Sequence, residues 1–192
     1  TQRAENRHTD FFATDWDEVV SEAGRPVWIV GNPPWVTNAE QGRYGASNLS
    51  SKANLKGLKG LDAITGGGNF DISEWMMIEL ARKLEQLPAV VALLVKTSVA
   101  RNFFQFVAAN SRKVSFDGLW RIDAMQHFGA AVDAGLFVFR LGSPPIGAHE
   151  CPVYGAMDAT EPTRHLGMVD GRLVADARSY KALRWLSSEN RH

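Results

Sequence analysis

Four consecutive residues, Asn32, Pro33, Pro34 and Trp35, have the types and spacing to do chemistry, and they follow the apolar run Val27–Gly31. Two successive prolines stiffen the backbone, because each has a fixed φ and biases the preceding residue towards an extended conformation. The turn offers the Asn32 side-chain oxygen, the Pro33 carbonyl and the Trp35 indole face. Two hydrogen-bond acceptors beside a stacking plane suit an amino group on a flat ring.

Such an amino group is a poor nucleophile, because its lone pair is delocalised into the ring. Two hydrogen bonds accepted from its N–H groups can draw the nitrogen towards tetrahedral geometry. They also stabilise the positive charge that grows as the nitrogen attacks a methyl sulfonium. This chemistry depends on positioning and electrostatics, so the site needs no histidine or carboxylate to remove a proton first.

An α/β sheet is predicted to position this turn. Val27–Gly31 and Ala89–Lys96 are apolar runs without alternation, which is typical of strands buried on both faces of a parallel sheet. Between them, apolar residues three or four apart predict a helix that begins at the N-cap Asp71, has Glu74 three residues on, and stops at Pro88. Ligands of such sheets bind beyond the carboxyl ends of the strands.

The second half of the chain predicts another helix and an antiparallel pair of strands. The helix spans 98–112, and the strands span 118–125 and 134–141. The loop between these strands is too short for a helical crossover, so they should run antiparallel. Asp170–Gly171 predicts a tight hairpin, and 176–187 a last amphipathic helix. We expect parallel strands that end in an antiparallel hairpin, followed by a C-terminal extension that leads away from the core.

Composition excludes several classes of protein. The 192 residues are 45% hydrophobic and 22% charged, which suits one soluble domain. Lys plus Arg equal Asp plus Glu, so a nucleic-acid partner requires a local patch. The lone Cys151 is expected to be a packed thiol in a reducing compartment. There is no apolar run of the roughly 18 residues that a membrane helix needs, no signal peptide and no metal-ligand spacing among the histidines. We therefore expect a cytoplasmic protein without a metal.

The segment 38–68 differs in composition from the rest of the chain, because it is rich in glycine and poor in apolar residues. Long loops inside compact domains are usually functional or mobile. Two interpretations stay open, a surface insertion and a basic flap that orders on a polyanion such as DNA. The cations of this segment are Arg43, Lys52, Lys56 and Lys59.

The turn at 32–35 resembles motif IV, the Asn-Pro-Pro-aromatic signature of S-adenosylmethionine-dependent amino-methyltransferases. It is above all similar to that of the N6-adenine DNA methyltransferases of bacterial restriction-modification systems. Thr9–Phe12 resembles motif III of this family. The resemblance implies that Asp10 accepts a hydrogen bond from the cofactor's adenine, that Phe11 packs on that ring, and that Asn32 also contacts the cofactor. A helix N-cap followed by two core phenylalanines is the alternative for Thr9–Phe12.

Further matches follow in the family's order. Residues 71–74 resemble the motif V region, and 95–98 resemble motif VI. Residues 127–129 fall where motif VIII places an aromatic side chain, which carries over to Phe128. The resemblance implies that Trp35 and Phe128 sandwich an adenine flipped out of the duplex. A core phenylalanine in a hairpin is the alternative for Phe128.

The resemblance covers Thr9 to Leu141, and nothing upstream can hold the cofactor-binding motifs I and II. We expect 1–145 to be the catalytic half of a Rossmann-like methyltransferase domain, with motifs III to VIII, and 146–192 to lead towards a target-recognition domain. The expected partners are double-stranded DNA, the missing N-terminal cofactor half and the C-terminal target-recognition domain of the same protein. Alone, the chain should bind S-adenosylmethionine weakly and be inactive.

Two other functions stay open. The substrate can be another planar amino group, a glutamine side chain in a release factor or a guanine amine in ribosomal RNA, because those families share the turn. Alternatively, the chain can be a non-catalytic interaction module that keeps the fold without the chemistry, since rigid turns also stabilise folds.

Overall fold

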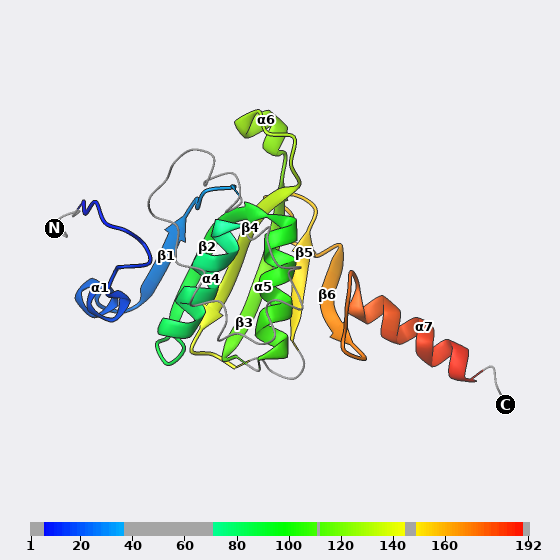
Figure 1. The fold of residues 1–192 in the computed structure, drawn as a ribbon. Coiled ribbons are helices and arrows are strands. Elements are labelled where there is room, and N and C mark those ends of the chain that lie inside the picture. Colours follow the sequence, from blue (N-terminus) through cyan, green and yellow to red (C-terminus); the bar gives the residue numbers. More distant parts are fainter. Residues whose placement is uncertain (1–5, 37–70, 111, 145–148, 190–192) are drawn as a thin grey trace.

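The computed structural model describes residues 6–36, 71–110, 112–144 and 149–189. These residues form one mixed sheet of seven strands, and helices α4 and α5 cover one of its faces (Figure 1). The strands are β1 (Val27–Gly31), β2 (Ala89–Lys96), β3 (Val114–Ile122), β4 (Ala134–Leu141), β5 (Glu150–Tyr154), β6 (Arg164–Val169) and β7 (Arg172–Val174). The helices are α1 (Trp16–Ala23), α4 (Ile72–Lys83), α5 (Thr97–Ala109), α6 (Ala124–Phe128) and α7 (Ala177–Glu189). None of these helices has the length and apolarity to cross a membrane.

The strand order is β1-β2-β4-β3-β5-β6-β7. β1 and β2 are parallel, joined through α4, as the sequence predicts. β3 and β4 form the predicted antiparallel pair, but β4 lies between β2 and β3 and runs antiparallel to both. The result is a mixed sheet, consistent with the predicted Rossmann-like fold, in which β4 and β6 run opposite to the other five described strands.

Several elements end elsewhere than predicted. α4 begins after its predicted N-cap Asp71 but ends at Lys83, several residues before Pro88. β3 spans 114–122 rather than 118–125. It ends earlier than predicted because Asp123 already caps the next helix, where its side chain accepts a hydrogen bond from the Gln126 N–H at 2.9 Å. A short helix, α6, therefore occupies part of the loop predicted between the two strands.

The first part of the C-terminal extension continues the sheet, whereas α7 projects away from it (Figure 1), and its course towards a target-recognition domain stays a prediction. β5 pairs in parallel with β3, β6 pairs antiparallel with β5, and β7 pairs antiparallel with β6. Cys151, Val153 and Leu166 are buried in the same hydrophobic core as α5. The predicted hairpin at Asp170–Gly171 is confirmed, since both residues have the positive φ that such a tight turn requires.

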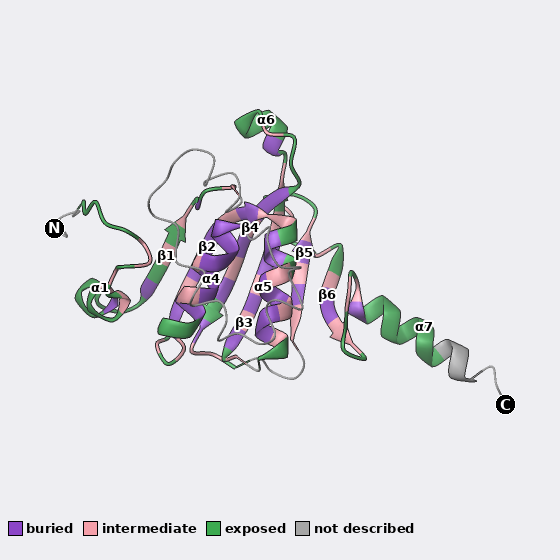
Figure 2. Cartoon of the chain, in the orientation of Figure 1, coloured by how far each residue is buried: buried purple, intermediate pink, exposed green. Residues whose placement is uncertain are grey.

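Phenylalanines dominate the core on the covered face of the sheet. Phe103 and Phe106 of α5 are at most 1% exposed, and so are Phe137 and Phe139 of β4. The Phe103 ring centroid lies 4.8 Å from that of Phe139. Each such burial stabilises the fold by about 1.5–3 kcal/mol, so this layer fixes α5 against β4 (Figure 2).

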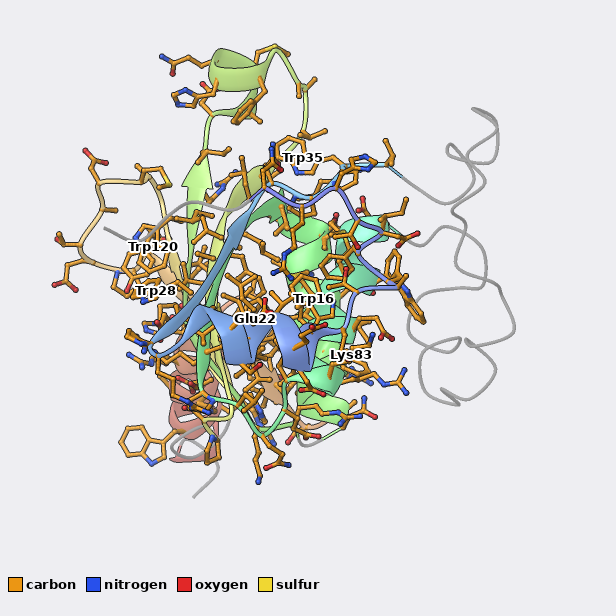
Figure 3. The ribbon with its side chains drawn as sticks, turned by 90° about the vertical axis from the view of Figure 1, so that its left-hand side faces the viewer. Trp16, Glu22, Trp28, Trp35, Lys83 and Trp120 are labelled. Atoms are coloured by element: carbon orange, nitrogen blue, oxygen red, sulfur yellow. The ribbon has the colours of Figure 1, made fainter. Side chains whose placement is uncertain are left out.

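The opposite face of the same strands is also apolar, but the described residues leave much of it open. Trp28 and Val30 of β1 are 64% and 73% exposed, so β1 is not buried on both faces as the sequence predicts. Trp120 lies on this side too, stacked on Tyr154 with centroids 4.4 Å apart. Figure 3 shows Trp28 and Trp120 on the side of the sheet away from α4 and Trp16.

Gly135 in β4 is predicted to be required for close strand packing. A Cβ atom there would lie 2.5 Å from the Trp120 backbone oxygen, which is too close without backbone movement. We expect Gly135→Ala to lower the free energy of unfolding by about 1–3 kcal/mol, measured by urea denaturation. Gly155→Ala is the matched control, because its Cβ would meet only Thr163 at 3.5 Å. Equal urea midpoints for the two variants would contradict this account.

Candidate active site

The residues of the Asn-Pro-Pro-Trp turn lie between the carboxyl end of β1 and the start of α4. Pro33 is buried, Asn32 is exposed and Trp35 is half-buried. The Val36 carbonyl accepts a hydrogen bond from the Ile72 N–H at 3.1 Å, which ties the far end of the turn to α4. The turn is thus held at both ends, on the strand edge that the sequence predicts.

Trp35 is fixed by a hydrogen bond to the neighbouring strand. Its indole Nε1 donates to the Leu94 carbonyl of β2 at 3.0 Å. Such a bond contributes about 0.5–1.5 kcal/mol and leaves the ring only limited rotation. The indole therefore stands at the carboxyl end of two adjacent parallel strands, next to Asn32.

The two acceptors of the turn remain available. In the described part of the chain, no group donates a hydrogen bond to the Asn32 side chain or to the Pro33 carbonyl. Exposed Asn32 can be solvated, but the Pro33 carbonyl belongs to a buried residue, and Pro34 has no N–H to give it. Both oxygens therefore keep the capacity to accept a hydrogen bond from a ligand.

The structure brings Phe128 to Trp35, although 93 residues of sequence separate them. Their ring centroids are 5.8 Å apart with an interplanar angle of 76°, an edge-to-face contact. A base stacked between two rings would hold them parallel and about 7 Å apart, so the predicted sandwich is not the arrangement present here. Phe128 is 52% exposed, which also excludes the alternative that it is a core phenylalanine.

Phe128 is carried by α6, which stands above the same edge of the sheet (Figure 1). Gly129 ends this helix in the left-handed conformation, with φ 63°, and donates to the Met125 carbonyl. After the helix, the Asp133 carbonyl accepts from the backbone N–H of Thr97 at 2.9 Å. The loop is therefore tied to the start of α5, and Met125 and Phe128 are each about half exposed.

A polar cluster joins α4 to the end of β2. Asp71 accepts hydrogen bonds from the backbone and hydroxyl of Ser73, which confirms it as the N-cap. Its other oxygen forms an ion pair with Lys96 at 3.0 Å. This pair gives Lys96, in the motif VI region, a structural role.

Glu74 does not complete the predicted capping interaction with Asp71. Its side chain is buried between α4 and α5, and its Oε2 accepts from the Asn102 amide at 2.9 Å. The Glu74 pKa is raised to about 7, mainly by burial; the Asn102 hydrogen bond lowers it and the nearby charge of Asp71 raises it. The sequence gives no sign of this, because an exposed helical glutamate has the same spacing.

The predicted cofactor residues near the N-terminus make contacts within the protein. Asp10 Oδ1 accepts from the Phe12 N–H at 2.8 Å. The Phe11 ring lies 4.7 Å from the Trp16 ring, and the Trp16 indole donates to the Phe11 carbonyl. These are the contacts of a local turn and a core aromatic, and the cofactor role of Asp10 and Phe11 stays a prediction.

Two other predictions have different outcomes. The predicted DNA-binding residues Arg43, Lys52, Lys56 and Lys59 lie outside the described residues.

Cys151 is fully buried, and desolvation together with nearby Asp117 raises its pKa far above the usual range of a thiol. The prediction that Cys151 is a packed thiol rather than a nucleophile is therefore confirmed.

Comparison with known proteins gives one informative similarity. No protein-family model matches this sequence. The chain is 40% identical over 131 residues to the Type II methyltransferase M.NspV of Nostoc sp. (strain ATCC 29411 / PCC 7524). The aligned region is 68% of this chain but 27% of that protein, so the chain spans about a quarter of the relative's length.

The raised pKa of Glu74 predicts a pH-dependent stability. Between pH 4.5 and about 7 the folded state keeps a proton that the unfolded state has lost, so the free energy of unfolding falls as the pH rises through this range. The total loss is at most about 3 kcal/mol. Glu74→Gln should be more stable than the wild type at pH 8 and should flatten the profile.

Thermal melts from pH 5 to pH 8 measure this effect. Glu79→Gln is the control, since that side chain lies on the same helix and pairs with Arg82 nearer the surface. A wild-type slope in the Glu74→Gln protein would rule out Glu74 as its source.

Proposed function

We propose that this chain, a relative of the type II methyltransferases, carries the catalytic half of an adenine-specific DNA methyltransferase of a restriction-modification system. The main support is the turn itself: the Asn32 side chain and the Pro33 carbonyl have no donor among the described residues, and Trp35, next but one to Pro33 in the sequence, has its indole anchored to Leu94. This is the arrangement that an exocyclic amine on a flat ring requires.

In the proposed reaction, Asn32 Oδ1 and the Pro33 carbonyl accept the two N–H groups of adenine N6. These hydrogen bonds direct the nitrogen lone pair away from the ring and stabilise the positive charge on nitrogen during attack. S-adenosylmethionine, when bound, supplies the electrophilic methyl group, and Asp10, Phe11 and Asn32 are the residues proposed to hold it. The surplus proton leaves N6 after transfer, so no general base is needed at the turn.

Trp35 and Phe128 are proposed to stack on the flipped adenine. Trp35 is held by its bond to Leu94, whereas Phe128 is half exposed on a helix of five residues. The edge-to-face contact between them must therefore open by movement of Phe128 rather than of Trp35. In the free protein, this contact shields the indole face that the base later occupies.

The open face of the sheet supports the proposal that a further segment completes the domain. Trp28 and Val30 are mostly exposed on an apolar face, and β1 is the sheet edge among the described strands. We propose that the N-terminal cofactor half covers this face, where burying each of the two side chains is worth about 1.5–3 kcal/mol. A target-recognition domain, double-stranded DNA as substrate and a cytoplasmic location belong to the same proposal.

Methyl transfer by the full-length protein tests the reaction. With tritiated S-adenosylmethionine and DNA, the labelled product should be N6-methyladenine, and Asn32→Ala should lower kcat at least about 100-fold. Asn32→Asp keeps a side-chain acceptor and should retain more activity than Asn32→Ala. Label on cytosine, on RNA or on a glutamine side chain, or full activity of Asn32→Ala, would refute the proposal.

Association with the N-terminal half tests the open face. Val30→Asp places a charge on the face proposed to be covered, so it should reduce co-purification with a separately expressed N-terminal half at least about tenfold. Leu183→Asp is the matched control, because Leu183 is similarly exposed, at 67%, on α7. Equal recovery of both variants would argue against this face as the contact surface.

A further inference from the structure

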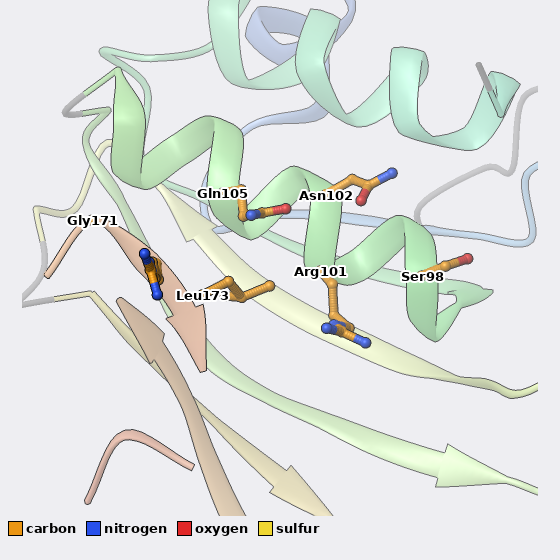
Figure 4. A pocket seen from close by; sticks show the side chains of 7 residues that line it. Ser98, Arg101, Asn102, Gln105, Gly171 and Leu173 are labelled. Carbon is orange, nitrogen blue, oxygen red and sulfur yellow. The ribbon is translucent and has the colours of Figure 1, made fainter. Parts of the chain in front are cut away.

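A groove separate from the Asn-Pro-Pro-Trp turn lies between α5 and the β6–β7 hairpin. Its volume is about 440 Å³. One wall is formed by α5, through Ser98, Arg101, Asn102 and Gln105, and the other by Gly171, Arg172 and Leu173 at the start of β7. Figure 4 shows the labelled α5 side chains and Leu173 around this space.

The groove is cationic. Arg101 and Arg172 are both exposed, and neither has an ion-pair partner in the described part of the chain. Most other described arginines do have one; for example, Arg178 pairs with Glu150. No carboxylate lines the groove, so nothing within it neutralises the two guanidinium groups.

The neutral residues of the groove suit a phosphodiester. Ser98 and Gln105 offer a hydroxyl and an amide, whereas the Asn102 amide nitrogen is already engaged by Glu74. Leu173 gives an apolar surface against which a sugar can pack. Guanidinium groups on two different elements can hold phosphate oxygens by paired hydrogen bonds, which a planar fork favours.

The groove begins near the proposed reaction site. Ser98 lies in the first turn of α5, directly after the carboxyl end of β2. The Asn-Pro-Pro-Trp turn follows the carboxyl end of β1, which is parallel and adjacent to β2. The groove therefore runs from the reacting edge of the sheet along α5 towards the β6–β7 hairpin.

We propose that this groove binds the phosphate backbone of the DNA strand beside the target adenine. The inference rests on the proposed function for the identity of the nucleic acid. Phosphate contacts position a protein on DNA without reading its sequence. Arg101 and Arg172 are accordingly assigned to affinity and register, and not to the choice of base.

Duplex DNA binding by the 192-residue chain tests this assignment, measured by fluorescence anisotropy from 50 to 200 mM salt. Arg101→Gln with Arg172→Gln should raise Kd at least about tenfold at 100 mM salt and reduce the slope of log K against log salt by about 1.8, at 0.9 per phosphate. Arg101→Lys with Arg172→Lys keeps the charge and should give an intermediate affinity.

The matched control is Arg178→Gln with Lys181→Gln, which removes the same charge from two cations that pair with Glu150. It should leave Kd and the salt slope near the wild-type values. Three results would overturn the inference: no binding of duplex DNA, equal loss in both double variants, or tighter binding of a glutamate-rich peptide than of DNA.

The proposed DNA-binding role of the groove and the proposed reaction can be refuted independently. Asn32→Ala should lower kcat at least about 100-fold and leave this DNA affinity unchanged. The groove variant should instead raise the KM for DNA in the full-length enzyme and still yield the same methylated base. If the groove variant binds DNA more weakly but the wild type forms no N6-methyladenine, the DNA-binding role of the groove is supported and the proposed reaction is refuted. Wild-type binding by the groove variant, with N6-methyladenine formed by the wild type, would refute the groove and support the reaction.

Discussion

The geometry of the whole site depends on one short stretch of backbone, the double-proline turn between β1 and α4. Prolines restrict it from within, and two hydrogen bonds hold it from outside, from the Trp35 indole to β2 and from the start of α4 to Val36. Because β1 and β2 are parallel and adjacent, the same constraint sets the turn beside the start of α5. The loop that carries Phe128 is in turn tied to α5 through Thr97 and Asp133.

What could be predicted from the sequence is local. The parallel strands at the two apolar runs, the Asp71 cap, the Asp170–Gly171 hairpin and the packed Cys151 follow from residue types and spacing, and the structure confirms them. The predicted burial of β1 on both faces was wrong. The resemblance to restriction-modification methyltransferases is confirmed by the 40% identity to a type II methyltransferase. The roles of Asn32, Asp10 and Phe11 remain predictions.

What could not be predicted is set by contacts between distant segments. Neither the insertion of β4 between β2 and β3 nor the parallel pairing of β5 with β3 leaves a local pattern in the sequence. The raised pKa of Glu74 likewise depends on burial by another helix. Strand boundaries failed where a capping residue, Asp123, ended β3 earlier than hydrophobicity alone suggests.

The net charge of zero and the cationic groove are compatible, because most of the arginines in the described part of the chain form ion pairs with carboxylates. Arginines on α7 and near the chain's surface pair with carboxylates, while Arg101 and Arg172 share a groove that contains none. Among the described residues, a polyanion would therefore meet a positive potential at this groove, where two guanidinium groups lack carboxylate partners. That location, beside α5 and next to the reacting edge, would draw the backbone towards the turn and leave the indole of Trp35 for the base. Binding and methyl transfer would thus be divided between neighbouring elements that the same parallel strands hold in register.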